Sequence, residues 1–135
     1  MPIVIVFAVI LAAAEADPPP AVLLYSSQAI DIAKAAAVEW NRGPLPRGTA
    51  FDVVDTDTDK RPGYSTVIYY VGDRPRLEIS INLKTGQIVE PNRCLLFTGP
   101  KIRAFSSLVR QKTGARLVPP DVLANEIGCD VLKPA

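Results

Sequence analysis

The chain has 135 residues, which is enough for one domain with its own hydrophobic core. Hydrophobic residues make up 48% of it and charged residues 21%, and this balance excludes an intrinsically disordered chain. The formal charge of +1 is too small for a nucleic-acid-binding surface, and the absence of histidine removes the commonest general base and metal ligand. We therefore expect no nucleic-acid partner, no catalysis, no metal and no cofactor.

The first 16 residues have the pattern of a secretory signal peptide. Residues 3–14 are apolar, and Ala14, Glu15 and Ala16 then give the small-x-small pattern that precedes a cleavage site. The apolar run is too short to cross a bilayer as a settled helix. We predict that residues 1–16 are a signal peptide and that the protein is periplasmic or secreted. The alternatives are an uncleaved segment that anchors the chain to a membrane and a buried N-terminal strand or helix.

A proline-rich linker, residues 17–25, precedes the clearest predicted helix. Ser26 or Ser27 can cap the start of this helix, and apolar residues then recur at steps of three and four. Trp40 falls on this apolar stripe, so we expect it in the core. Gly43 is the residue type that commonly follows a helix end.

The middle of the chain has the character of strands. Residues 49–55 and 64–71 are rich in β-branched and aromatic residues, and the second half of 64–71 is apolar on both faces, which predicts a central strand covered on both sides. Residues 76–83 alternate apolar and polar side chains, which predicts a half-exposed antiparallel strand. Gly86 would then turn the chain so that residues 87–90 pair back. A phosphate-binding loop would need more glycines and a helix directly after the turn.

The C-terminal third is predicted to be helical. Pro100 suits the first turn of one helix, and Pro119, Pro120 and Asp121 open a shorter one. Strands and crossover helices do not alternate, which disfavours a parallel sheet. We predict that residues 26–135 form a single α+β domain. Its N-terminal helix packs on an antiparallel sheet of 3–5 strands, and its C-terminal helices cover part of the other face.

The two cysteines, Cys94 and Cys129, are predicted to form a disulfide bond, because an even number of cysteines in an exported chain favours pairing. They make a poor zinc site, since no histidine completes a ligand set. A catalytic thiol would also lack a histidine as its base. The bridge would fasten the C-terminal segment to the end of the sheet.

Two short stretches resemble PepSY domains. Residues 27–34 (S-Q-A-I-D-I-A-K) match the Ala-Ile-x-Ile-Ala start of the helix in that family, and residues 77–89 (L-E-I-S-I-N-L-K-T-G-Q-I-V) look like its closing hairpin. Asn82 stands where the family more often has Asp. The resemblance covers residues 26–90 and implies an exported cystatin-like module that binds or inhibits other proteins. It implies no catalytic residues.

The turn after the predicted central strand carries the candidate binding residues. Arg74 and Arg76 lie close in sequence to Tyr69 and Tyr70. Arginine and tyrosine together suit recognition of a carboxylate or of an aromatic-rich partner surface. The alternative is an ordinary solvated hairpin tip with half-buried tyrosines.

The acidic run of residues 52–59 is the one stretch with a metal-binding pattern. Three of its aspartates match the first three ligand positions of a calcium loop. Lys60, however, stands where glycine is needed, and Thr66 stands where a bidentate glutamate is needed. The run is therefore interpreted as a strand end that leads into a polar hairpin loop.

From the residues and the resemblance together, we expect a small exported non-catalytic binding or inhibitory module. Its partner would be another protein of the cell envelope or the extracellular space. A membrane-held structural or assembly factor is the alternative if the N-terminal segment is uncleaved. A metal-binding or carboxylate-dependent enzyme built on residues 52–59 fits the sequence less well.

Overall fold

The computed structural model describes residues 19–58 and 61–135, and the side chains of residues 55–58 are not among what it describes. The predicted signal peptide therefore lies outside the described residues. Within the described ranges, no helix has the length and apolar character needed to cross a membrane.

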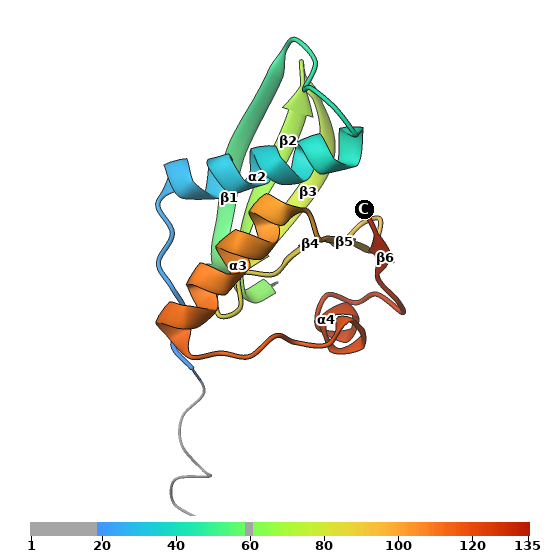
Figure 1. Cartoon of the computed structure of the whole chain (residues 1–135). Coiled ribbons are helices and arrows are strands. Elements are labelled where there is room, and N and C mark those ends of the chain that lie inside the picture. The colour runs from blue at the N-terminus through green and yellow to red at the C-terminus, as the bar shows by residue number, and fades with distance from the viewer. Residues whose placement is uncertain (1–18, 59–60) are drawn as a thin grey trace, which may run out of the picture.

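The described chain forms one mixed sheet with three helices (Figure 1). In chain order the elements are α2 (Ser26–Asn41), β1 (Thr49–Thr58), β2 (Arg61–Val71), β3 (Arg74–Asn82), β4 (Ile88–Glu90), β5 (Leu95–Phe97), α3 (Pro100–Thr113), α4 (Pro120–Glu126) and β6 (Lys133–Pro134). The six strands lie in the order β1 to β6, and all neighbours are antiparallel except β5 and β6. The predicted α+β fold is confirmed. The sheet has more strands than predicted because the tail after α4 returns to it as β6.

Helix α2 packs on the sheet through a face of small residues. Its buried residues are Ala29, Ile32, Ala33, Ala36 and Ala37. They contact the inward side chains of the central strands, Val67, Tyr69, Leu77, Ile79 and Ile81. Alanine keeps helix propensity high and lets the helix approach the sheet closely. Burial of each large apolar side chain in this layer contributes about 2 kcal/mol.

Both ends of α2 differ from the prediction in detail. The serine cap is wrong: Tyr25 is the N-cap residue, and its N–H donates to Oε1 of Gln28 at 3.0 Å. At the other end Arg42, rather than a glycine, takes the left-handed conformation, with φ of 57°. The start of the helix is thus capped through the side chain of Gln28 and not through a serine hydroxyl.

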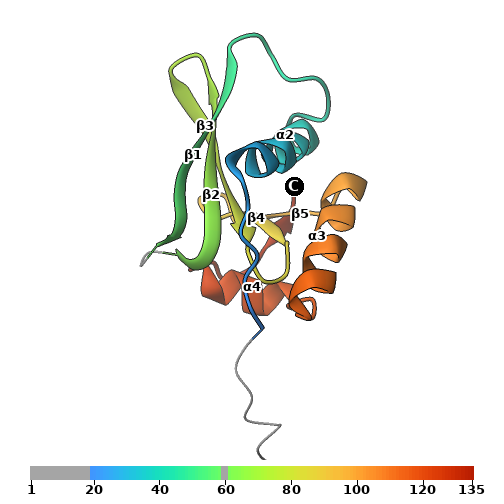
Figure 2. The same ribbon diagram turned by 90° about the vertical axis from the view of Figure 1, so that its left-hand side faces the viewer.

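The two C-terminal helices lie on opposite faces of the sheet. Ile102 of α3 joins the core beneath α2, whereas Leu123 of α4 packs with Tyr64 and Val89 on the other face. Figure 2 shows α2 and α3 on the same side of the strands. The expectation that both helices cover the other face is therefore wrong for α3.

The seven residues of α4 cover only the start of β2 on that second face. Further along β2, Ile68 and Tyr70 point the same way as Tyr64 and are partly exposed. The prediction that the second half of β2 is covered on both sides is wrong, because α4 does not reach it. The upper part of this sheet face remains open.

Strand β3 is more buried than predicted. Ser80 and Asn82 were expected to be exposed, yet both are buried. The carboxamide oxygen of Asn82 accepts the N–H groups of Lys84 and Thr85 at 2.9 and 3.0 Å, and this holds the turn before β4. Asn82 is therefore a structural turn residue.

The same turn anchors α3. The hydroxyl of Ser106 donates to the carbonyl of Thr85 at 2.7 Å, and that of Thr113 donates to the carbonyl of Lys84 at 2.6 Å. Gly86 has φ of 71°, and a Cβ placed there would lie 2.7 Å from Cα of Ser106. The turn at Gly86 therefore contacts α3 directly and is bonded to it. Because β4 and not a helix follows this turn, it lacks the geometry of a phosphate-binding loop.

The predicted disulfide is present. Cys94, in the turn between β4 and β5, is bonded to Cys129 just after α4, and their Cα atoms are 5.9 Å apart. The N–H of Lys133 donates to the carbonyl of Cys94 at 2.9 Å. The bridge therefore fastens both α4 and the C-terminal tail to the sheet.

Removing the disulfide should destabilise the fold. The double variant Cys94→Ala/Cys129→Ala is expected to lose about 3 to 4 kcal/mol of unfolding free energy, because the bridge spans a sequence separation of 35. Urea unfolding followed by circular dichroism measures this. Reductant should lower the midpoint of the unaltered chain and leave that of the double variant unchanged. Equal midpoints for the two proteins would contradict the prediction.

The close contact of α3 with the turn at Gly86 can be tested with two glycines that have nearly the same positive φ. Gly86→Ala should cost about 3 kcal/mol, since it adds a clash with α3 to the strain of positive φ. At Gly114, with φ of 72°, a Cβ would meet no atom within 4 Å outside the neighbouring backbone, so Gly114→Ala should cost only about 1 kcal/mol. Chemical unfolding compares them, and an equal loss in both variants would refute the close approach of α3.

Candidate functional site

Three segments far apart in sequence meet at one end of the molecule. The N–H of Gly72 at the β2–β3 tip donates to the carbonyl of Gly48 at 2.9 Å, which holds the α2–β1 loop against the hairpin. The side-chain amide of Asn41 donates to the hydroxyl of Tyr69 at 3.0 Å, which fixes the end of α2 above β2. The turn between β4 and β5 completes this end.

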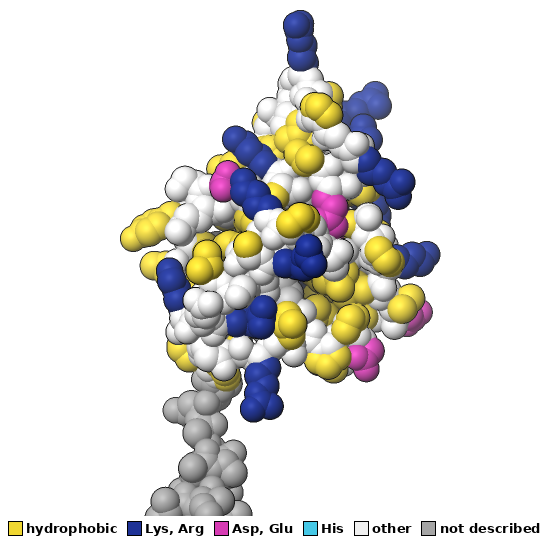
Figure 3. All heavy atoms as spheres, viewed as in Figure 1, with side chains coloured by type: hydrophobic (Ala, Val, Ile, Leu, Met, Phe, Trp, Pro, Cys, Tyr) yellow, Lys and Arg dark blue, Asp and Glu magenta, His cyan; other side chains and the backbone are white. Residues whose placement is uncertain are grey.

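Five exposed arginines lie on these three segments: Arg42, Arg47, Arg74, Arg76 and Arg93. We call this region the arginine-rich end. In Figure 3, Lys and Arg side chains gather at the top and upper right, where Figure 1 places the hairpin tip and the end of α2. The arrangement concentrates positive charge on a chain whose formal charge is +1.

Trp40 is the centre of the arginine-rich end. The guanidinium carbons of Arg76 and Arg93 lie 5.5 and 5.3 Å from the centroid of its ring. Each cation–π contact of this kind contributes about 0.5 to 1 kcal/mol at a partly exposed site. Trp40 was expected to be a core residue, and it does pack against the core, but it also orients two surface arginines.

Glu90 holds the turn that carries Arg93. Its carboxylate is fully buried, and it accepts the N–H groups of Glu78 and Arg93 at 2.9 and 2.6 Å. The guanidinium of Arg93 is also 3.7 Å from this carboxylate. A buried carboxylate is stable only when it is paired in this way. Glu90 is therefore a positioning residue for the arginine-rich end.

A groove of about 540 Å³ opens beside these arginines. Arg76 and Arg93 line it together with Glu78 and Asn92. Glu78 is already engaged, because it accepts the side-chain amide of Asn92 at 3.1 Å and lies 3.7 Å from Nε of Arg61. The groove therefore presents two guanidinium groups next to a carboxylate whose charge is compensated.

The predicted binding residues do not all share this surface. Tyr69 is 1% exposed and stacks on Phe51 with ring centroids 5.3 Å apart, so its assignment to a binding surface is wrong. Tyr70 faces the open side of the sheet and is partly exposed, and Arg74 and Arg76 are exposed at the arginine-rich end. A binding role for these three stays a prediction.

Sequence reasoning missed the other members of the arginine-rich end. Arg42, Arg47 and Arg93 come from loops whose meeting depends on tertiary contacts, and no spacing in the sequence reveals it. The alternation of side chains along a strand could have separated Tyr69 from Tyr70, because neighbours on a strand face opposite sides.

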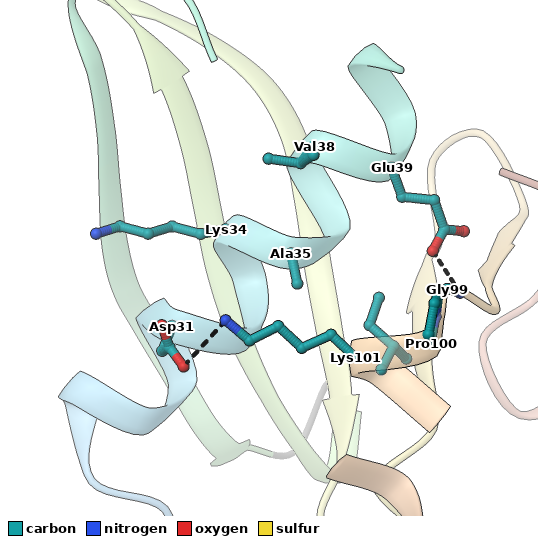
Figure 4. Close-up of a pocket in the computed structure, with 9 residues that line it drawn as sticks. Asp31, Lys34, Ala35, Val38, Glu39, Gly99, Pro100 and Lys101 are labelled. Carbon is teal, nitrogen blue, oxygen red and sulfur yellow. Dashed lines mark hydrogen bonds and ion pairs between the residues drawn. The ribbon is translucent and has the colours of Figure 1, made fainter. Parts of the chain in front are cut away.

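A second hollow, of about 490 Å³, lies between α2 and α3 (Figure 4). Its walls are mainly apolar and include Ala35, Val38 and Ile102. The carboxylate of Glu39 accepts the N–H groups of Thr98 and Gly99 at 3.0 and 2.6 Å. Glu39 thus stabilises the start of α3, where the helix dipole favours negative charge.

A third, smaller hollow of about 290 Å³ is lined by Tyr64 together with Asn82 and Glu126. The hydroxyl of Tyr64 donates to Oε2 of Glu126 at 2.8 Å. Burial raises the pKa of Tyr64 far above its ordinary value, while the hydrogen bond to Asn82 acts in the opposite direction. The phenol therefore stays protonated at neutral pH, which makes it unsuitable as a base or nucleophile.

The acidic run does not take the shape of a calcium loop. Residues 49–58 belong to β1 and pair with β2, and the buried Thr66 sits within β2. The side chains of Asp55 and Asp57, and the whole of residue 59, lie outside the described part of the chain. Across that described part, no three His, Cys, Asp or Glu side chains are grouped so as to hold a metal ion.

Comparison with known proteins adds one fold relationship. No protein-family model matches the chain, and no curated protein sequence matches it. The structure is similar to a chain from a type VI secretion system effector–immunity complex of Pseudomonas protegens, with a TM-score of 0.62 and 23% sequence identity. The alignment covers 78% of this chain and 90% of that chain. A likeness at this level of identity establishes a shared fold.

If Glu90 holds the turn that carries Arg93, neutralising its carboxylate should destabilise the fold. Glu90→Gln should cost about 2 kcal/mol of unfolding free energy, because the amide cannot accept both backbone N–H groups and no longer attracts Arg93. The emission of Trp40, the one tryptophan, should also change as Arg93 leaves its ring. Asp130→Asn is the control at an exposed position, with an expected cost below about 0.5 kcal/mol. Equal urea midpoints for both variants would count against this role.

Proposed function

We propose that this chain is a small exported module that binds and inhibits another protein, in the manner of one member of an effector–immunity pair. The observation that carries the proposal is the fold shared with a chain from such a complex. The alignment takes in 90% of that chain, so the likeness concerns a whole folding unit and not a fragment. The toxic protein of the pair would be the target.

The proposed mode of action is occlusion by binding, without catalysis. The chain has no histidine, and the phenol of Tyr64 is held in its protonated form. The carboxylates of Glu39 and Glu90 are committed to backbone N–H groups. These side chains support the fold, whereas arginine and tryptophan at the arginine-rich end are the residue types that dominate protein–protein binding.

The proposed place of action is the periplasm or the extracellular space. The Cys94–Cys129 bridge supports it, because such bonds persist in oxidising compartments. The predicted signal peptide supports it too. We also propose that residues 26–90 are related to PepSY domains, since a helix packed on an antiparallel hairpin sheet is what that resemblance implies.

Protection from a toxic neighbour tests the proposal. Proteins encoded beside this chain are natural candidates, because inhibitors of this kind often act on something encoded nearby. Each neighbour is exported to the periplasm of a test bacterium, alone or together with this chain. We expect one neighbour to arrest growth, the chain to restore growth, and the two purified proteins to elute as one complex. If the chain neither restores growth nor forms a complex with any neighbour, the proposal is wrong.

A further inference from the structure

We propose that the arginine-rich end is the surface that docks the partner, and that it recognises an acidic protein surface with at least two neighbouring carboxylates. This inference rests on the proposed function and specifies the chemistry of the partner. It assigns the contact to the end formed by Trp40 and its arginines, not to the apolar hollow between α2 and α3.

Charge is the first support. The arginine-rich end carries five guanidinium groups, and Asp73 is an exposed carboxylate on the same segments. Of the other carboxylates close by, Glu90 is buried, Glu78 is paired with Arg61, and Glu39 accepts backbone N–H groups. Among the described residues, Arg42, Arg47, Arg74 and Arg76 form no ion pair with an acidic side chain. Unpaired guanidinium groups at one end of a nearly neutral protein attract and orient an acidic partner.

Geometry is the second support. Arg76 and Arg93 converge on one aromatic ring and line one groove. A guanidinium group binds a carboxylate through two parallel hydrogen bonds, so two such groups suit a pair of acidic side chains. Stacking on Trp40 and anchoring by Glu90 hold the arginines in place before the partner arrives, which reduces the entropy lost on binding.

The surroundings of the groove favour a protein over a polyanion such as DNA. Ile68 and Pro75 line the groove, and Ile68 together with Tyr70 lies on the sheet face that α4 leaves open. Asp52 is exposed and pairs in register with Ile68, so it lies on the border of the groove. A carboxylate there repels a continuous phosphate backbone, whereas a folded partner can match mixed charge and apolar area.

Direct binding can be measured with the fluorescence of Trp40. The probes are a synthetic peptide of alternating glutamate and glycine, the same peptide with lysine in place of glutamate, a short DNA duplex and phosphatidylglycerol vesicles. We expect the glutamate peptide to change the emission of Trp40 in a saturable manner. Arg76→Ala should weaken the affinity for this peptide by about tenfold, and Arg76→Lys should weaken the affinity less. No saturable response to the glutamate peptide, or tighter binding of DNA or vesicles, would overturn the inference.

Charge reversal in the protection assay separates this inference from the proposed function. The variant is Arg74→Glu/Arg76→Glu. The control is Lys112→Glu/Arg116→Glu, which makes the same charge change at exposed positions. Lys112 lies in the last turn of α3 and Arg116 lies just after this helix, away from the arginine-rich end. Urea unfolding confirms that both fold. We expect only the first variant to lose protection. If both variants protect equally, the arginine-rich end is not the docking surface, while the proposed function stands. If the unaltered chain does not protect, the proposed function itself fails.

Discussion

The close contact between α2 and the sheet is the constraint on which the rest of the molecule depends. Ala33, Ala36 and Ala37 have no exposed surface, and no bulky side chain separates the helix from the strands at these positions. Because the helix lies so near the sheet, Asn41 reaches the hydroxyl of Tyr69. The last turn of the helix then places Trp40 where Arg76 and Arg93 can stack on it. A larger residue at any of these alanines would move the arginine-rich end as well as the core.

Two glutamates hold backbone segments on either side of Trp40 in position. Glu39 binds the backbone N–H groups at the start of α3, and Glu90 binds those of Glu78 and Arg93. Charged acceptors make stronger hydrogen bonds than neutral ones, so each carboxylate can fix a backbone segment. The aromatic ring of Trp40 lies within this framework. Trp40 follows Glu39 in sequence and stacks with Arg93, so both carboxylates support the arginine-rich end.

Much of the fold follows from local patterns in the sequence. Apolar spacing identified α2, alternation identified β3, and the even number of cysteines in a chain with an export pattern predicted the Cys94–Cys129 bond. The side of the sheet taken by α3 could not be predicted, because an amphipathic stripe requires burial but does not say against which face. On the face that α3 takes, the hydroxyl groups of Ser106 and Thr113 bind the turn at Gly86, and Ile102 joins the core.

The candidate site was harder to predict than the fold. Arg74 and Arg76 were identified because they share a hairpin tip with tyrosines, whereas Arg42, Arg47 and Arg93 join them only after the chain has folded. Tyr69 was misassigned because the sequence does not state which face of β2 receives α2. The polar residues of β3 were also misjudged, since Asn82 is buried to hold a turn.

We propose that a partner protein binds at the arginine-rich end. Amide hydrogen exchange of the chain, free and in complex with a partner found by the protection assay, tests this proposal most directly. We expect slower exchange at the β2–β3 tip, in the loop between α2 and β1 and in the turn between β4 and β5. Slower exchange confined to the facing sides of α2 and α3, with these three segments unchanged, would contradict it.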